Sequence, residues 1–566
     1  MVNMYDSLNK AAAGLASSQA GLNVTGNNIN NINTEGYSRQ RVEIKNDNGL
    51  IITEDPKRVY SDIIAKNLRH EKSDYEQYDT MENGLKSVNI YFNELEIGAG
   101  LGDSFKEYFN AWSDLANTTP DNTAESLSKK EVVVDKASVL TNKINETAKS
   151  IERQRNDSNE KIKDYTKKAN ELADEIASIN KKIVSIENDY KKANELRDRR
   201  DVLLDQLSEL VDITTFEHAN GMVSVYVANN PLVDGLVSNK LILKENSENY
   251  YDIFLGNEKY GENINITTNI KAGKIKGELE LRDNYYKEYT DKLDNLKEAL
   301  IFETNKIYTT GYGESYFNSL TSAKGVLSKD AKLTNDPIIG DKIQKGTVQF
   351  SIFDSSGNHI DDISINIDPT VDSLNSIASE INEDKNIPIH ASVTEDGRLQ
   401  VRGEKDYTFA VKNDTTNLLA ALQFNAFFID DSSGEIKVND LVKENLNYLN
   451  THSFVSSGDN SNALSLANLK YKSIESLNNQ TIEGYYTVLT TKIASDISEI
   501  KSFKSTKDYA VRQMELKLDE VKGVSLDEEF INMLKFQKAY EANARMVTAI
   551  DQMMDTIINN MGIVGR

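Results

Sequence analysis

The sequence predicts a multidomain α+β fold. Helices at the two ends of the chain pair as coiled-coil-like segments, and between them lie a long helical bundle and two β-rich central inserts. Three observations predict it: apolar residues recur every three or four positions near both ends, the stretch between Gly102 and Gly221 contains no glycine, and alternating apolar–polar runs occur in the middle. Because 566 residues exceed what one hydrophobic core usually holds, we expect several domains.

The first predicted helix carries a single stripe along one face. Its positions follow alternating spacings of four and three, the repeat that keeps one face of a helix against a partner helix. Between Leu8 and Ile29 the stripe alternates large and small positions, and the small ones would let another helix approach closely. The stripe consists of Met4, Leu8, Ala11, Leu15, Ser18, Leu22, Thr25, Ile29 and Ile32.

The last predicted helix carries a second stripe of almost the same regularity, and no proline follows Pro388 to interrupt it. It consists of Phe530, Met533, Gln537, Tyr540, Ala544, Val547, Ile550, Met554, Ile557 and Met561. Isolated helices of this length are marginally stable in water, and neither helix can cover its stripe by itself. We therefore expect both ends to fray in the single subunit and to become ordered against neighbouring chains. The predicted assembly interface is Met4, Leu8, Leu15, Leu22, Ile29, Phe530, Met533, Tyr540, Val547, Met554 and Ile557.

A long helical region lies between the first helix and the first insert. Its repeat of four and three runs through Ile162, Tyr165, Ala169, Leu172, Ile176, Ile179, Ile183, Ile186, Tyr190 and Ala193, with charged residues on the other faces. This pattern predicts a long helix or a helical hairpin with one buried seam. A bundle packed inside the protein is favoured over an exposed dimeric coiled coil.

The middle of the chain changes to a period of two. The runs 222–227, 347–353 and 363–367 alternate as half-buried strands do, and turn signals such as Asp396-Gly397 separate such runs. A short helix is expected to begin at Thr370, a helical return to occupy 278–312, and the chain to be helical again after about 440. The predicted domains are a terminal helical assembly domain (1–50 with 523–566), a helical bundle domain (51–211 with 276–325 and 441–522), a β-rich insert (212–275) and an outer β-rich insert (326–440).

Charge and composition exclude several classes of partner and chemistry. The formal net charge of −24 repels nucleic acid and anionic lipid, so we expect neither nucleic acid nor membrane as a partner. Cysteine is absent, which excludes thiol chemistry. The chain starts without a basic segment followed by an apolar core, and no run approaches 18 apolar residues. Neither a cleavable signal peptide nor a membrane span is expected.

Signals for catalysis are also missing from the sequence. The five histidines include no pair at the spacing of a helical zinc site, and no phosphate-binding glycine motif occurs. The acidic pairs Asp361-Asp362 and Asp430-Asp431 lie beside Ser-Ser-Gly turns and lack a complete calcium loop, so they indicate hairpin turns. We predict no catalytic residue, no metal ligand and no cofactor, and hence no enzyme.

One segment is recognisable. Residues 31–42, NINTEGYSRQRV, resemble the motif that closes the first helix of flagellar rod, hook and hook-associated proteins. Glu35 stands where that family often has proline. Glycine just past a helix supplies permissive backbone angles, and the following tyrosine can pack back over the helix. The GYSRQ form is typical of the hook-associated members, and the motif residues are Gly36, Tyr37, Ser38, Arg39 and Gln40.

Five further segments resemble the same family and occur in its order. They are 194–211, 272–283, 417–428, 458–469 and 523–557, of which the last is similar to the C-terminal helix shared by flagellar axial proteins. The resemblance implies a structural subunit that is exported by the flagellar type III apparatus without a cleavable signal peptide. Such a subunit lies in the extracellular flagellum at the hook–filament junction and supports motility. The implied partners are copies of itself in a ring, the hook protein, a second junction protein below the flagellin filament, and an export chaperone on the C-terminal helix.

Two alternatives remain at this point. The chain could be another flagellar axial subunit, such as a hook protein. It could also be a secreted coiled-coil adhesin or effector with an uncharacterised central domain, which would form a compact monomer and keep its activity after both ends are removed.

Overall fold

The computed structural model describes residues 2–47, 50–92, 100–118, 123–187, 192–256, 263–383, 388–431, 433–453 and 459–560. The chain forms two compact units. Unit 1 comprises Met1–Gly84, Arg155–Asn284 and Ile497–Arg566, and unit 2 comprises Leu85–Gln154 and Tyr285–Asp496. Long helices together with several small sheets confirm the predicted multidomain α+β class. The four-domain division predicted from the sequence stays a prediction.

Three long helices contain residues of both units. They are α2 (Asp62–Phe92), α4 (Ala124–Ile186) and α12 (Ile482–Lys522). The absence of glycine and proline from 124–186 allows α4 to continue for 63 residues. The predicted seam residues Ile162, Ala169 and Ile176 are fully buried along it. The helix ends at Ile186, so Ala193 lies outside it, directly before the next helix, although the repeat of four and three reaches it.

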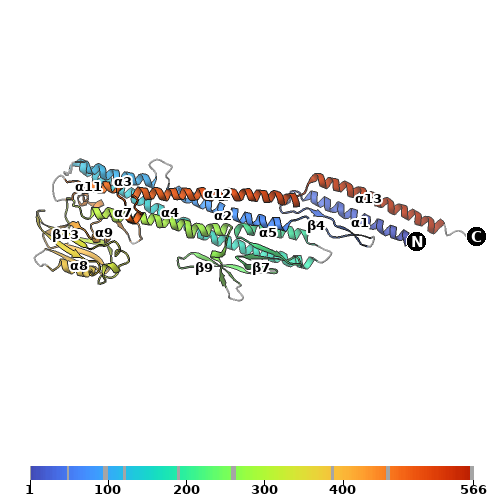
Figure 1. Ribbon diagram of the computed structural model, residues 1–566, viewed down its shortest axis with the longest axis horizontal. Coiled ribbons are helices and arrows are strands. Elements are labelled where there is room, and N and C mark those ends of the chain that lie inside the picture. Colours follow the sequence, from blue (N-terminus) through green and yellow to red (C-terminus); the bar gives the residue numbers. More distant parts are fainter. Residues whose placement is uncertain are drawn as a thin grey trace, which may run out of the picture. The chain divides into compact units, whose positions relative to one another are not determined.

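Unit 1 contains both terminal helices, a small hairpin and a β-rich insert (Figure 1). Its remaining elements are α1 (Val2–Asn30), β1 (Gln40–Arg41), β2 (Ile44–Asp47), β3 (Leu50–Thr53), β4 (Lys57–Arg58), α5 (Asn194–Leu210), β5 (Thr214–Glu217), β6 (Val223–Val227), β7 (Asn230–Asp234), β8 (Val237–Ser238), β9 (Lys240–Glu245), β10 (Tyr251–Gly256), β11 (Asn263–Asn265), η1 (Thr267–Asn269), α6 (Lys274–Glu280), α13 (Leu526–Asp555) and η7 (Thr556–Asn560).

The insert of unit 1 packs its sheets on two helices. Strands β5, β6, β7 and β8 form one antiparallel sheet in that order, and β10 pairs with β9 and β11 in another. Apolar residues of both sheets share one core with α4 and α5, including Ile176, Leu204, Val225 and Ile253. The predicted strand at 222–227 is confirmed as β6, and all of its residues except Tyr226 are buried.

Unit 2 contains the second group of strands and the ends of the long helices. Its remaining elements are α3 (Leu101–Ala116), η2 (Leu281–Tyr285, whose last residue lies in unit 2), α7 (Tyr286–Tyr308), β12 (Ser319–Gly325), η3 (Leu333–Asn335), β13 (Gly346–Asp354), β14 (His359–Ile367), α8 (Leu374–Ile381), β15 (Ile389–Val393), β16 (Arg398–Gly403), β17 (Tyr407–Asp414), α9 (Leu418–Ala421), β18 (Phe428–Asp430), β19 (Ile436–Val438), α10 (Asp440–Glu444), η4 (Leu446–Tyr448), α11 (Ser461–Asn468), η5 (Leu469–Tyr471) and η6 (Glu475–Leu477).

Two three-stranded sheets and α8 enclose the main core of unit 2. The sheet orders are β14-β13-β17 and β12-β16-β15, with every pairing antiparallel. The predicted strands at 347–353 and 363–367 are confirmed as β13 and β14. The short helix predicted from Thr370 begins at Leu374 instead, because Ser373 caps it and accepts a hydrogen bond from the backbone N–H of Ser376.

The part of the chain after 440 is less helical than predicted. Only short helices, α10, η4, α11, η5 and η6, occur among the described residues between 440 and 481. Continuous helix resumes at Ile482 with α12. The helical return predicted at 278–312 is confirmed as the end of α6, η2 and α7.

Candidate assembly site

The two terminal helices, α1 and α13, pack side by side in unit 1 (Figure 1). Glycines of α1 bring the helices close together. A β-carbon on Gly14 would lie 2.7 Å from the side chain of Asn543, and one on Gly21 would lie 2.5 Å from the ring of Phe536. Contacts of this length leave no room for a side chain at Gly14 or Gly21 unless the opposite residue moves.

A third contact extends the same pattern. The side-chain amide of Asn28 donates a hydrogen bond of 3.1 Å to Glu529 Oε2. Each step of seven residues forward along α1, from Gly14 to Gly21 to Asn28, corresponds to a step of seven residues backward along α13. This spacing is that of an antiparallel coiled coil.

The face of α1 that is buried consists of small and polar residues. The buried residues are Ala11, Gly14, Ser17, Ser18, Gly21, Val24, Thr25 and Asn28. The small positions of the predicted stripe therefore lie in or beside the seam, as the close approach requires. The large positions lie at its edge, because the seam is displaced by about one residue from the line of leucines.

The predicted interface residues of α1 flank this seam. All five are half-buried, namely Met4, Leu8, Leu15, Leu22 and Ile29. On α13 and η7, Met533, Val547 and Met554 are half-buried, whereas Phe530 is 51% exposed and Tyr540 and Ile557 are each 40% exposed. None of these eleven side chains is fully covered within the single chain.

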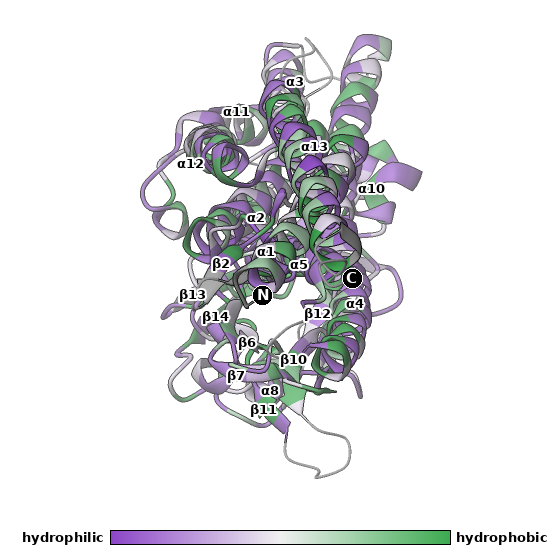
Figure 2. Ribbon diagram, turned by 90° about the vertical axis from the view of Figure 1, so that its right-hand side faces the viewer, coloured by the Kyte–Doolittle hydropathy of each residue, from purple (hydrophilic) through white to green (hydrophobic). Residues whose placement is uncertain are grey.

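Helix α13 exposes more apolar surface than one stripe contains. Leu534 is 59% exposed and Ile558 in η7 is 67% exposed. The other exposed large apolar residues of this segment are Leu526, Ile531, Met546 and Met553. Figure 2 shows apolar turns along α13 in green. A search for one residue per turn misses these positions, because the apolar surface of α13 extends around more than one face.

The GYSRQ segment, residues 36–40, forms hydrogen bonds with the C-terminal end of α1. Asn28 is 1% exposed, and its Oδ1 accepts hydrogen bonds from the Tyr37 hydroxyl at 2.7 Å and from the Gln40 backbone N–H at 3.0 Å. Its amide donates to the Gln40 carbonyl at 2.9 Å as well as to Glu529. Burial, and then the nearby negative charge of Asp198, raises the pKa of Tyr37 to about 12, so the hydroxyl keeps its proton.

Arg39 connects the same segment to the beginning of α13. Its Nε donates to Glu529 Oε1 at 2.8 Å, and its Nη1 lies 2.8 Å from Glu528 Oε2. Its backbone N–H donates to the carbonyl of Lys522, the last residue of α12. Because Glu529 is buried, Arg39 compensates a charge that water cannot reach.

Gly36 occupies a position that only glycine fits. Its φ is +79°, and a β-carbon there would lie 2.3 Å from Val202 Cγ2 on α5. Two residues further on, the backbone N–H of Ser38 donates to Asp198 Oδ2 at 3.3 Å. Segment 31–42 therefore lies directly against α5.

Acidic residues of α5 form ion pairs with two arginines whose side chains are largely buried. Arg58 Nη1 lies 2.6 Å from Asp198 Oδ1 and 2.8 Å from Asp201 Oδ2. Arg69 Nε lies 2.6 Å from Asp205 Oδ1. The sequence singled out 31–42 and 194–211 as separate family-like segments, and the structure brings them together around these ion pairs.

Comparisons with known proteins find similarity to flagellar proteins. A family model described as the flagellar hook-associated protein FlgK helical domain matches residues 85–316, and one described as the flagellar basal body rod FlgEFG protein C-terminal matches residues 519–561. Flagellar hook-associated protein 1 of Bacillus subtilis is 25% identical over all of both chains. The protein of the same name from Salmonella typhimurium is 24% identical over 98% of this chain and all of its own. The resemblance to flagellar hook-associated protein 1 is confirmed.

The fold of this chain is similar to that of a solved flagellar hook junction protein. The flagellar hook junction protein FlgK from Burkholderia pseudomallei aligns with a TM-score of 0.51 and 14% identity, covering 81% of this chain and all of that one. At this identity, the likeness concerns the fold alone. The rod-protein match at 519–561 includes all of α13.

The other segments that resemble hook-associated proteins contain residues that hold the fold together. Gly273 has φ +94°, and a β-carbon there would lie 2.6 Å from the carbonyl oxygen of Leu210. A β-carbon on Gly277 would lie 2.8 Å from the Gln77 carbonyl oxygen. In unit 2, Asn305 accepts from the backbone N–H groups of Phe427 and Phe428 and so fixes segment 417–428. Within segment 458–469, residues 461–468 form α11. Gly458 lies outside the described residues.

Sequence reasoning did not single out Asn28, Arg58 or Glu529, although they join the parts of the site. Asn28 lies in a run of asparagines, and Glu529 belongs to a run of three acidic residues at the first turn of α13. Such residues usually face water near helix ends. Only the fold shows that their partners come from hundreds of residues away.

The described part of the chain offers little for chemistry. No cluster of three or more histidines and carboxylates there could hold a metal ion. Among the same residues, every helix is too short or too polar to cross a bilayer. The geometry of the site is that of a packing surface.

Proposed function

We propose that the chain is a structural subunit of the bacterial flagellum that joins the hook to the filament and assembles through α1 and α13. Its full-length similarity to hook-associated protein 1 of two bacteria supports the place in the flagellum. The uncovered apolar flanks of the α1–α13 pair support the mode of assembly.

The exposed apolar residues of α13 carry the proposal. Contiguous apolar surface on a soluble chain indicates an interaction site. Full burial of such a side chain contributes roughly 1.5–3 kcal/mol, and about half of it remains to be gained at Phe530 and Leu534, so a row of them stabilises an assembly that no single contact could hold. The seam itself contributes less, because it buries glycine, serine and threonine.

The proposed partners are other parts of the flagellum. Copies of the chain form a ring, with the hook protein on one side and a second junction protein, below the flagellin filament, on the other. An export chaperone covers α13 before secretion by the type III apparatus. The protein lies in the extracellular flagellum, leaves the cell without a cleavable signal peptide, and acts as a structural protein with no catalytic role.

The domain division is part of the same proposal. Residues 1–50 and 523–566 form the assembly domain, the helical bundle of 51–211, 276–325 and 441–522 supports it, and the inserts at 212–275 and 326–440 face outward. Both terminal helices belong to unit 1, which supports the first of these domains. Strand β12 begins at Ser319, ahead of the proposed outer insert.

Leu22→Asp tests the proposed interface. Leu22 lies at the edge of the seam, where a neighbouring chain would cover it, so a carboxylate there is expected to abolish junction formation and filament growth while the melting of the inserts stays unchanged. Tyr540→Asp is expected to do the same from α13. Filaments per cell and thermal unfolding of the purified chain are the measurements.

Asn23→Asp is the matched control for Leu22→Asp. Asn23 is the next residue of α1 and is exposed, so the same charge there is expected to leave filaments unchanged. Normal filaments from cells that carry Leu22→Asp would contradict the proposed interface. The presence of the wild-type chain in purified flagella, in small amounts relative to flagellin, checks its location.

A further inference from the structure

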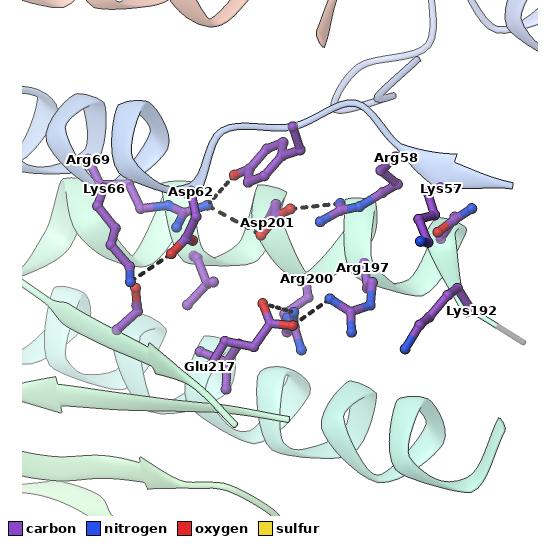
Figure 3. A pocket seen from close by; sticks show the side chains of 15 residues that line it. Lys57, Arg58, Asp62, Lys66, Arg69, Lys192, Arg197, Arg200, Asp201 and Glu217 are labelled. Carbon is purple, nitrogen blue, oxygen red and sulfur yellow. Dashed lines mark hydrogen bonds and ion pairs between the residues drawn. The ribbon is translucent and has the colours of Figure 1, made fainter. Parts of the chain in front are cut away.

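A basic pocket lies between β4, the start of α2, α5 and the β5–β6 hairpin, all within unit 1. Its volume is about 250 Å³. Figure 3 shows basic side chains on either side of Asp201, with Arg197, Arg200 and Glu217 below. Basic residues outnumber acidic ones in this lining although the whole chain carries a net charge of −24.

Most of these cations are already compensated. Arg58 is paired with Asp198 and Asp201, and Arg69 with Asp205. Lys57 and Lys66 at the rim lie 2.5 Å from Glu43 and 2.7 Å from Asp62. Arg197 Nε lies 2.6 Å from Glu187 Oε1. These ion pairs hold the walls and leave little positive charge for a ligand.

Arg200 is different. Its side chain is 1% exposed, and its Nη1 donates to the Gly221 carbonyl at 2.6 Å and to Asn180 Oδ1 at 3.3 Å. The carboxylate of Glu217 is 3.6 Å from Nη2, beyond hydrogen-bonding distance, and Nε has no hydrogen-bond partner. Burial lowers the pKa of Arg200, while the charges of Asp201 and Glu217 act in the opposite direction.

Lys192 adds a second cation to the same pocket. Its Nζ is 3.6 Å from Glu187 Oε2, an oxygen that already accepts from Arg197 Nη2 at 2.9 Å. Lys192 and Arg200 line the pocket, and each has one ion pair of 3.6 Å, longer than a hydrogen bond, with Glu187 and Glu217 respectively. A buried polar atom without a partner is costly, and an anion is the ligand that removes this cost.

We propose that this pocket binds a small inorganic oxyanion of the phosphate or sulfate class, held by Arg200 from the buried side and by Lys192 from the rim. A tetrahedral oxyanion offers acceptors to both groups at once. Arg200 also holds the carbonyl of Gly221, so the anion stabilises the contact of the β insert with α5. The site belongs to the single chain and is independent of the proposed assembly.

Inorganic phosphate is the probe, added to the full-length monomer at constant ionic strength with chloride as the comparison. We expect the melting temperature to rise with phosphate and to saturate, as binding to one site requires. Arg200→Gln is expected to weaken phosphate binding about tenfold or more, and Lys192→Gln several-fold, since each removes a charge-assisted hydrogen bond. Lys168→Gln is the matched control, because Lys168 is exposed on α4 outside the pocket, and it is expected to bind as the wild type does.

Phosphate also stabilises proteins generally by exclusion from their surface, but that effect does not saturate and is equal in all variants. A wild-type chain without a saturable rise would overturn the proposal, and so would Arg200→Gln with an unchanged rise. If Arg200→Gln does not fold, the phosphorus NMR signal of inorganic phosphate is measured with Lys192→Gln and with Lys168→Gln. Less broadening of this signal by Lys192→Gln than by Lys168→Gln supports the site. Equal broadening by the two variants refutes it.

Discussion

Gly21→Val is expected to separate α1 from α13 and to abolish filament assembly. A β-carbon at Gly21 would lie 2.5 Å from the ring of Phe536, and the branched side chain of valine extends further. Either the ring leaves the seam or the helices move apart, and both changes displace the flanking residues Leu22 and Tyr540 that neighbouring chains would cover. The loss should appear as absent filaments in cells and as failure of the purified chain to polymerise.

Gly26→Val separates this packing effect from helix propensity. Both glycines lie in the same helix, so valine changes the intrinsic propensity of α1 equally at either position. A β-carbon on Gly26 would meet no atom within 4 Å, and Gly26→Val is therefore expected to assemble. Equal assembly by the two variants would show that α1 and α13 do not approach as closely as the structure indicates.

Arg58→Ala is expected to lower the free energy of unfolding of unit 1 by about 3–5 kcal/mol, the usual cost of removing one partner from a buried ion pair. The side chains of Asp198 and Asp201 are only 10% and 14% exposed, so removal of the guanidinium leaves two largely buried carboxylates without their closest cation. Urea unfolding, followed by a probe placed in the β insert of unit 1, measures the change.

Lys57→Ala, one residue earlier, is the matched comparison. Lys57 is 47% exposed and forms an ion pair with Glu43, so its loss should change the same free energy by less than about 1 kcal/mol. A similar small change for Arg58→Ala would mean that its ion pairs do not hold the GYSRQ segment and α5 together.

Local periodicity predicted the elements whose apolar residues recur at a regular spacing. Helix α4 could be predicted from its unbroken spacing and its lack of glycine, and β13 from strict alternation. These patterns depend only on which face of an element is apolar. They do not show where a helix ends, which is why the repeat at 162–193 continued past the end of α4 at Ile186.

The register of the α1–α13 seam could not be predicted in the same way. A search for large apolar residues selects Leu15 and Leu22, whereas the helices meet at Gly14 and Gly21, one position earlier. Glycine contributes no apolar side chain, so its role appears only when the partner helix is present. The distinction between seam and flank is therefore tertiary information.

The β2–β3 hairpin and the GYSRQ contacts show two different reasons for a missed feature. Asn48-Gly49 directly before the apolar run Leu50–Ile52 is a hairpin signal that could have predicted β2 and β3. By contrast, nothing local in 31–42 shows that Asn28, Arg39 and Glu529 join across 490 or more residues of sequence. The family resemblance identified the segments as related but did not show that they touch.

Hydrogen exchange along α1 and α13, in the monomer and in the polymer, tests the central claim most directly. In the monomer the pair buries mainly small residues, so we expect protection there to be far weaker than in α4 and to rise strongly on polymerisation. Protection as strong as that of α4 in a demonstrably monomeric sample, with no increase in the polymer, would contradict assembly through these helices.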